Sequence, residues 1–231
     1  MTAEAILEGQ ILLIDKPLTW SSFQAVNKLK YILKRKYDLP KKFKIGHAGT
    51  LDPLATGLLI VCTGKFTKKI TEIQGQAKEY TGTFTVGATT PSYDLETEIN
   101  VTFPIEHITE ALIQETTKQF VGEIDQKPPD FSAIKKDGIR LYEHARAGEE
   151  VEIAYRKTTI HEFEITRIAL PEIDFRVVCS KGTYIRSLAY DFGMALNSGG
   201  YLSALRRTKI GNFSVDNGIS PEEFEKIVTQ E

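Results

Sequence analysis

The sequence is most informative in "KIGHAGTLDPLATGLLIVCTG", which runs from Lys44 to Gly64. It sets one carboxylate, Asp52, in a glycine-rich loop directly before a continuous apolar run. A short apolar run bounded by glycines is typical of a buried strand. The loop has two interpretations. Asp followed by Pro is a common helix start, which would make 52–57 one helical turn. Alternatively, a rigid loop directs the carboxylate outward as a nucleophile or base.

The segments before this loop predict a strand and then a helix. "QILLIDKP" (10–17) is typical of a strand that ends at a proline. "SSFQAVNKLKYILKRK" (21–36) predicts a helix that Ser21 or Ser22 caps, with lysines on its outer side. The residues that we expect near its inner face are Phe23, Val26, Leu29 and Leu33.

After the loop, strands and helices are interspersed. "KEYTGTFTVGATT" (78–90) alternates as a half-buried strand does, with Tyr80, Phe84 and Val86 on one face. We expect a helix over 108–124, a short helix over 139–148, two strands joined near Pro171, and a helix that Thr183 caps. No repeat or linker divides the chain. The pattern therefore predicts a mixed α+β fold in a single domain, 1–231.

The composition is ordinary for a soluble globular protein. Of the 231 residues 41% are hydrophobic and 26% are charged, and no apolar run is long enough to cross a bilayer. The N-terminus does not resemble a secretion signal. Cys62 and Cys179 lie in apolar strand-like runs, so we expect buried, reduced thiols. The four histidines lack metal-ligand spacing.

The net charge is −2, but the charges are unevenly distributed. The segment 28–44 carries eight Lys and Arg residues and one Asp, whereas the C-terminal segment is acidic. A local basic run favours a binding site for a polyanion. The alternative is an ordinary solvated helix face.

Six segments resemble one family in its own order. They are "LLIDKPLTWSSFQAVNKLK", "GHAGTLDPLATGLLIVCTGKFTK", "KEYTGTFTVGATT", "KPPDFSAIKKDGIRLYEHARAGEEVE", "VVCSKGTYIRSLAYDFG" and "YLSALRRTKIGNFS". Together they cover nearly the whole chain, and they resemble the TruB-type tRNA pseudouridine synthases. The resemblance implies an isomerase that converts uridine 55 in the T-loop of tRNA. It also implies a largely antiparallel mixed sheet flanked by helices, with an RNA-binding thumb at about 127–150.

The resemblance implies that Asp52 is the catalytic nucleophile and that Arg186 lies beside it. An adjacent guanidinium favours and orients a charged carboxylate. Without the resemblance, Arg186 would be expected as a solvated arginine in the first turn of a helix. Tyr80 is implied as a further catalytic residue that lies against the uracil. Pseudouridine formation breaks the N1–C1′ bond and rejoins the ring through C5, so no metal or organic cofactor is expected.

The resemblance also implies how RNA is held. The target nucleotide is expected to flip out of its loop, and His47 to fill the vacated space. The residues implied to contact the substrate are His47, Gly49, Thr50, Tyr80, Tyr184 and Leu205. Basic side chains are expected to contact phosphates: Lys34, Arg35, Lys41, Lys42, Lys44, Lys135 and Arg146.

Two departures from the family pattern stand out. The chain ends soon after "GNFSVDNGISPEEFEKIVTQE", so no C-terminal PUA domain is expected. In "ATTPSYDLETE", Pro91 stands near the position of a common family aspartate. The partner implied is the T-arm stem-loop of tRNA, bound by a cytoplasmic monomer without metal or membrane. A non-catalytic RNA-binding protein or tRNA folding chaperone is the alternative function.

Overall fold

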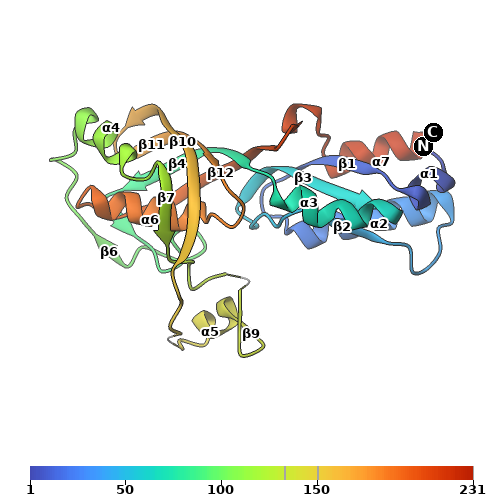
Figure 1. Cartoon of the computed structure of the whole chain (residues 1–231), viewed down its shortest axis with the longest axis horizontal. Coiled ribbons are helices and arrows are strands. Elements are labelled where there is room, and N and C mark those ends of the chain that lie inside the picture. The colour runs from blue at the N-terminus through green and yellow to red at the C-terminus, as the bar shows by residue number, and fades with distance from the viewer. Residues whose placement is uncertain (133, 150, 231) are drawn as a thin grey trace. The chain divides into compact units, whose positions relative to one another are not determined.

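The computed structural model describes residues 1–132, 134–149 and 151–230. Its contacts divide the chain into two compact units, which we call the first unit (residues 1–80 and 205–231) and the second unit (residues 81–204). Figure 1 follows the chain through both. Strands β4 (Lys78–Val86) and β12 (Gly200–Ile210) contribute residues to each unit.

The first unit holds an antiparallel sheet segment with one parallel pair. Strand β1 pairs antiparallel with β3, as β2 does, and β3 pairs in parallel with the end of β12. The elements of this unit other than β4 and β12 are α1 (Ala3–Glu8), β1 (Ile11–Lys16), α2 (Ser22–Tyr37), β2 (Ile45–His47), β3 (Ala55–Thr63), the 3-10 helix η1 (Gly64–Lys69), α3 (Ile70–Gly75), β13 (Phe213–Ser214), the 3-10 helix η2 (Val215–Asn217) and α7 (Pro221–Gln230).

Strand β3 is buried on both faces, which explains its continuous apolar sequence. Leu59 and Val61 pack into one core with helices α2 and α7. Leu58, Ile60 and Cys62 of β3 lie in a second core, with Ile73 of α3 and Ile210 of β12. The buried strand predicted after the Asp52 loop is therefore confirmed. The alternative of a helical turn over 52–57 is wrong, because a turn over 53–54 leads directly into β3.

Helix α2 confirms the predicted helix and corrects its inner face. Ser21 is the cap: its hydroxyl accepts a hydrogen bond from Gln24 N in a capping box. The buried side includes Val26 and Leu29, as predicted, but Phe23 is 70% exposed. In the first turn Ser22 is the buried residue instead, because its hydroxyl is hydrogen-bonded to the backbone of Leu51.

The second unit holds the sheet order β12-β4-β11-β10-β7, in which β10 pairs antiparallel with both of its neighbours. Its remaining elements are β5 (Ala88–Thr89), β6 (Val101–Thr102), α4 (Glu110–Lys118), β7 (Gly122–Gln126), β8 (Lys135–Lys136), β9 (Ile139–Arg140), α5 (Leu141–Arg146), β10 (Arg156–Ala169), β11 (Glu172–Cys179) and α6 (Ile185–Ala195). The predicted mixed fold, largely antiparallel and flanked by helices, is confirmed.

The core of the second unit is aromatic. The rings of Phe84 and Phe175 stack with centroids 4.1 Å apart, and Phe163 and Phe192 lie 5.5 Å from each other. Phe192 comes from α6, so this cluster fixes the helix against β4, β10 and β11. The aromatic side chains thus position the helix that carries Arg186.

Two local predictions in this unit are wrong. The predicted helix over 108–124 ends at Lys118, and its last residues belong to β7, whose residues alternate in exposure. Helix α6 begins after Tyr184 without a side-chain cap. Thr183 does not cap it, because its hydroxyl donates to the Ser180 carbonyl and also contacts Thr158. Both cysteines are buried, as predicted.

Candidate active site

A buried arginine holds the backbone of the Asp52 loop. Arg207 on β12 is 1% exposed. Its guanidinium donates to the carbonyls of Leu58 at 2.8 Å, Gly49 at 3.1 Å and Thr50 at 3.3 Å. A planar group with five donors can hold three carbonyls at once. The loop that precedes Asp52 is therefore fixed to β3 and β12.

The residues on either side of Asp52 are anchored separately. The Ser22 hydroxyl donates to Leu51 O at 3.0 Å and accepts from Leu51 N at 2.8 Å. On the other side, Thr19 N donates to Pro53 O at 2.8 Å. Asp52 itself is half-buried. Asp52 therefore stands on a rigid backbone with part of the residue's surface exposed, which suits a nucleophile.

Lys16 supplies a buried positive charge within electrostatic reach of Asp52. Its ammonium group donates to the carbonyls of Pro17 at 2.9 Å and Trp20 at 2.6 Å. Burial lowers the pKa of Lys16 to about 8, while the negative charge of Asp52 raises it and Arg207 lowers it further. Sequence reasoning missed both Lys16 and Arg207. A lysine at the end of an apolar strand, in "LLIDKP", was the available signal for the former.

Five other residues that are predicted to contact the substrate lie in the first unit. His47 ends β2, and burial lowers its pKa, so the imidazole is neutral at pH 7. Tyr80 is buried in β4, on the face predicted for it. Leu205 is half-buried and pairs with Ala55, three residues after Asp52. Of the loop residues predicted to bind substrate, Gly49 is half-buried and Thr50 is exposed.

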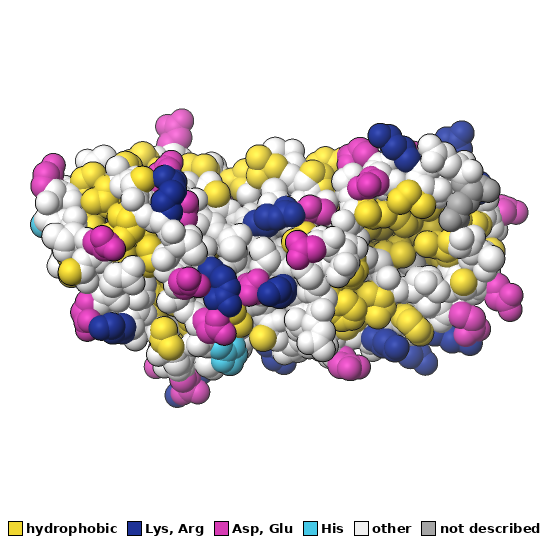
Figure 2. Space-filling model, turned by 90° about the horizontal axis from the view of Figure 1, so that it is seen from above, with side chains coloured by type: hydrophobic (Ala, Val, Ile, Leu, Met, Phe, Trp, Pro, Cys, Tyr) yellow, Lys and Arg dark blue, Asp and Glu magenta, His cyan; other side chains and the backbone are white. Residues whose placement is uncertain are grey.

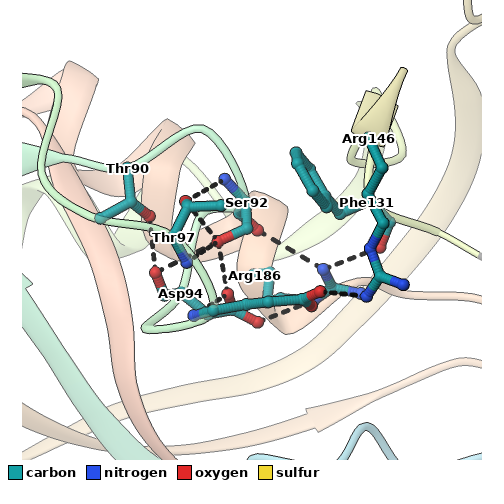
Figure 3. Close-up of polar contacts among 8 residues, drawn as sticks. Thr90, Ser92, Asp94, Thr97, Phe131, Arg146 and Arg186 are labelled. Atoms are coloured by element: carbon teal, nitrogen blue, oxygen red, sulfur yellow. Dashed lines mark hydrogen bonds and ion pairs between the residues drawn. The ribbon is translucent and has the colours of Figure 1, made fainter. Parts of the chain in front are cut away.

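Arg186 and Tyr184 belong to the second unit. Arg186 is 5% exposed, so the alternative of a solvated arginine is wrong. Its guanidinium donates to Phe131 O at 2.9 Å and to Ser92 O at 3.4 Å (Figure 3). Its Nε lies 3.7 Å from a carboxylate oxygen of Asp94. The predicted proximity of Arg186 to Asp52 stays a prediction.

The loop that holds Asp94 is a compact polar network (Figure 3). Asp94 accepts hydrogen bonds from the Ser92 hydroxyl at 2.6 Å and from Glu96 N at 2.9 Å. The Thr90 hydroxyl donates to Asp94 O at 2.7 Å. A buried carboxylate needs such partners, and here they direct its second oxygen toward Arg186. Sequence reasoning noticed Pro91 in this loop but missed Asp94.

Tyr184 is positioned by its backbone. The side-chain amide of Gln126 accepts from Tyr184 N at 2.8 Å and donates to Tyr184 O at 3.0 Å. The same unit contains a cavity of about 500 Å³ that the stacked rings of Tyr93 and Tyr190 line together with Phe131. Arg186 donates to the carbonyl of that phenylalanine. The second unit thus combines a buried cation with a neighbouring aromatic cavity.

The predicted phosphate contacts differ in their availability. Six of them are exposed: Arg35, Lys41, Lys42, Lys44, Lys135 and Arg146. Lys34 is half-buried, and Arg146 lies 2.7 Å from Glu96 in an ion pair. On the face drawn in Figure 2, basic and acidic side chains are intermixed. This face is therefore not a broad basic surface, in keeping with the net charge of −2.

Among the described residues, no group of three or more His, Cys, Asp or Glu side chains is placed to hold a metal ion. In the same part of the chain, no helix has the length and apolar character of a membrane span.

Comparison with known proteins identifies the family. Residues 34–185 match the model of the TruB family pseudouridylate synthase (N terminal domain). The chain belongs to the TruB family of pseudouridylate synthases. As a family member it is an isomerase, and the match extends from helix α2 through the Asp52 loop to the start of α6.

Two TruB-family relatives match almost end to end. A protein of Flavobacterium johnsoniae named tRNA pseudouridine synthase B is 80% identical over 98% of this chain and 99% of its own length. A protein of Phocaeicola vulgatus with the same name is 54% identical over 97% of this chain and 95% of its own length.

Solved structures show the same TruB-family fold. A chain from the crystal structure of a Cbf5-Nop10-Gar1 complex is 30% identical, with a TM-score of 0.71 over 95% of this chain. A chain from the structure of an H/ACA RNP bound to a substrate RNA containing 2'-deoxyuridine is 27% identical, with a TM-score of 0.69 over 96% of this chain. This chain spans about half the length of each of those solved chains.

Proposed function

We propose that this protein converts uridine 55 in the T-loop of tRNA into pseudouridine, with Asp52 as the nucleophile. The observation that carries the proposal is the Asp52 loop itself. Its backbone is fixed on both sides by Ser22, Thr19 and Arg207, while Asp52 is half-buried within electrostatic reach of Lys16. Such pre-organisation suits a group that must attack one ribose or base atom in a bound nucleotide.

The substrate is inferred from the relatives. Proteins that match this chain over nearly all of both lengths are named tRNA pseudouridine synthase B. The reaction is an isomerisation: the N1–C1′ bond breaks, a C5–C1′ bond forms, the C5 proton leaves and N1 gains a proton. Asp52 is proposed to carry the covalent step. Tyr80 is proposed to lie against the uracil and Arg186 to orient the carboxylate.

The remaining substrate contacts are proposed from the same resemblance. His47 fills the space of the flipped base, and its neutral ring fits an uncharged stacked position. Tyr184 and Leu205 line the base site with Gly49 and Thr50. The exposed lysines that follow α2 hold phosphates of the T-arm, and the thumb at about 127–150 covers the RNA within a single catalytic domain. The monomeric state and the cytoplasmic location stay predictions; two buried cysteines suit a reducing compartment.

The test is to incubate the purified protein with an unmodified T-arm hairpin and to map pseudouridine at single-nucleotide resolution. One pseudouridine is expected, at the loop position that corresponds to uridine 55. A matched hairpin with cytidine at that position should remain unmodified. Binding of the hairpin without any conversion would contradict the proposal and support the chaperone alternative, which the names of the relatives do not favour.

A further inference from the structure

Two apolar side chains beside the Asp52 loop face solvent. Phe23, in the first turn of α2, is 70% exposed, and Leu18, in the turn before it, is 54% exposed. A single exposed apolar residue is ordinary. These two differ because Leu18 lies in a strained turn and Phe23 follows it, and both segments are hydrogen-bonded to the Asp52 loop.

The turn is strained at Thr19, whose φ is 69°. A β-branched residue rarely adopts a positive φ, and glycine would adopt it freely. Hydrogen bonds enforce this conformation. Thr19 N donates to Pro53 O, and the Lys16 ammonium group donates to the carbonyls of Pro17 and Trp20. Enforced strain of this kind is concentrated at functional sites. Its structural effect here is to hold Leu18 at the tip of the turn.

The same contacts join the exposed pair to Asp52. Ser22 immediately precedes Phe23, and its hydroxyl makes both hydrogen bonds with the backbone of Leu51. Leu51 and Pro53 flank Asp52, and each is hydrogen-bonded to a residue of the segment 18–23. Leu18, Phe23 and the carboxylate are therefore displayed by one rigid piece of the first unit.

The charge of the segment that follows Phe23 indicates which kind of partner covers this surface. Helix α2 and the segment after it, through residue 44, carry eight Lys and Arg residues and one Asp. Arg35, Lys41, Lys42 and Lys44 are exposed. These cations lie in the last turn of α2 and after it, whereas Phe23 lies in the first turn. A single strand of nucleic acid that runs along the helix would meet both, because its phosphates bind cations while its bases stack on aromatic rings.

We propose that Phe23, supported by Leu18, is a platform on which an unpaired base of the substrate RNA stacks while another nucleotide reaches Asp52. This inference rests on the proposed function for the identity of the RNA. Phe23 offers a ring face and no hydrogen-bonding group, so the platform contributes affinity and register without reading the base. The phenyl ring, and not merely an apolar side chain, is the feature that matters.

The test uses the full chain with Phe23→Ala, Phe23→Leu and Phe23→Trp, and Ile227→Ala as a matched control. Ile227 is 45% exposed on α7, in the same unit. Binding of the T-arm hairpin is measured by fluorescence anisotropy. We expect Phe23→Ala to weaken binding about 5- to 100-fold, Phe23→Leu to weaken it nearly as much, and Phe23→Trp and Ile227→Ala to remain within about twofold of the wild type. Thermal unfolding checks that each variant folds, and Leu18→Ala is a second variant at the same surface.

A second readout places the base. Hairpins carry 2-aminopurine at one unpaired loop position at a time, with the target uridine kept. At one position the wild type and Phe23→Trp should change the fluorescence, and Phe23→Ala should not. Wild-type affinity in Phe23→Ala would overturn the platform, and wild-type affinity in Phe23→Leu would overturn stacking. Failure of the proposed function is distinguishable, because a wild type that binds the hairpin without isomerising it leaves the comparison of these affinities intact.

Discussion

The replacement of Lys16 by Met removes a buried charge while it keeps the length of the side chain. Lys16 is fully buried, and burial lowers its pKa from 10.5 to about 8. In the unfolded chain its pKa returns to the ordinary value. Between pH 8 and 10.5 the folded protein has therefore released this proton, while the unfolded chain still holds it. Stability contributed by Lys16 then rises with pH, by about 3 kcal/mol in total.

The assay is urea denaturation of the wild type and Lys16→Met at intervals from pH 7 to 10.5. Groups common to both proteins cancel in the difference between their unfolding free energies. We expect this difference to move in favour of the wild type by about 3 kcal/mol across the interval. Lys65→Met is the control: that lysine is exposed and paired with Glu8, so its difference should stay nearly flat.

Asp52 supplies a further check on the same charge. The carboxylate raises the pKa of Lys16. In an Asp52→Asn background, the difference in unfolding free energy should therefore begin to rise at a lower pH. A constant difference between the wild type and Lys16→Met over the whole interval would contradict the lowered pKa of Lys16. It would mean that Lys16 titrates as it does in water.

Three further changes test the supports of the site by denaturation. Arg207→Met leaves three backbone carbonyls without their donor and should cost about 3 kcal/mol or more of stability; a loss below 1 kcal/mol would contradict this role. Gly57→Ala should destabilise by more than about 1 kcal/mol, since Gly57 has a φ of +100° and an added Cβ would lie 2.3 Å from the carbonyl oxygen of Arg207; an unchanged urea midpoint would argue against it. Asp94→Asn removes the carboxylate that faces the buried Arg186 and should cost about 3 kcal/mol, whereas a neutral effect would show that the carbonyl acceptors alone are sufficient.

Local pattern was enough to predict the elements that surround the Asp52 loop. The apolar run of β3 and the alternation of β4 follow directly from burial on two faces and on one face. Periodicity failed at Phe23, where it predicts a core position. The Ser22 hydroxyl, which is hydrogen-bonded to the backbone of Leu51, takes the inward position in place of the Phe23 ring. Residue spacing alone cannot predict that contact.

The candidate site divides in the same way. A motif could point to Asp52, but the groups that hold its loop come from other strands. Arg207 is about 150 residues from the carbonyls it binds, and Lys16 acts through charge at a distance. For Arg186, the position in the first turn of a helix favoured exposure to solvent. The residue is buried instead, and its contacts with Asp94 and Phe131 come from loops far along the chain. Such long-range pairing cannot be read from single-sequence periodicity.

The replacement Asp52→Asn, assayed in a single-turnover reaction, shows whether Asp52 is the nucleophile. The variant is nearly isosteric, so the loop contacts of Leu51 and Pro53 should persist and the T-arm hairpin should bind with close to wild-type affinity. With enzyme in excess over hairpin, we predict complete conversion of one uridine by the wild type and no detectable pseudouridine from Asp52→Asn. Conversion by the variant at the wild-type rate would contradict the assignment of Asp52 as the nucleophile.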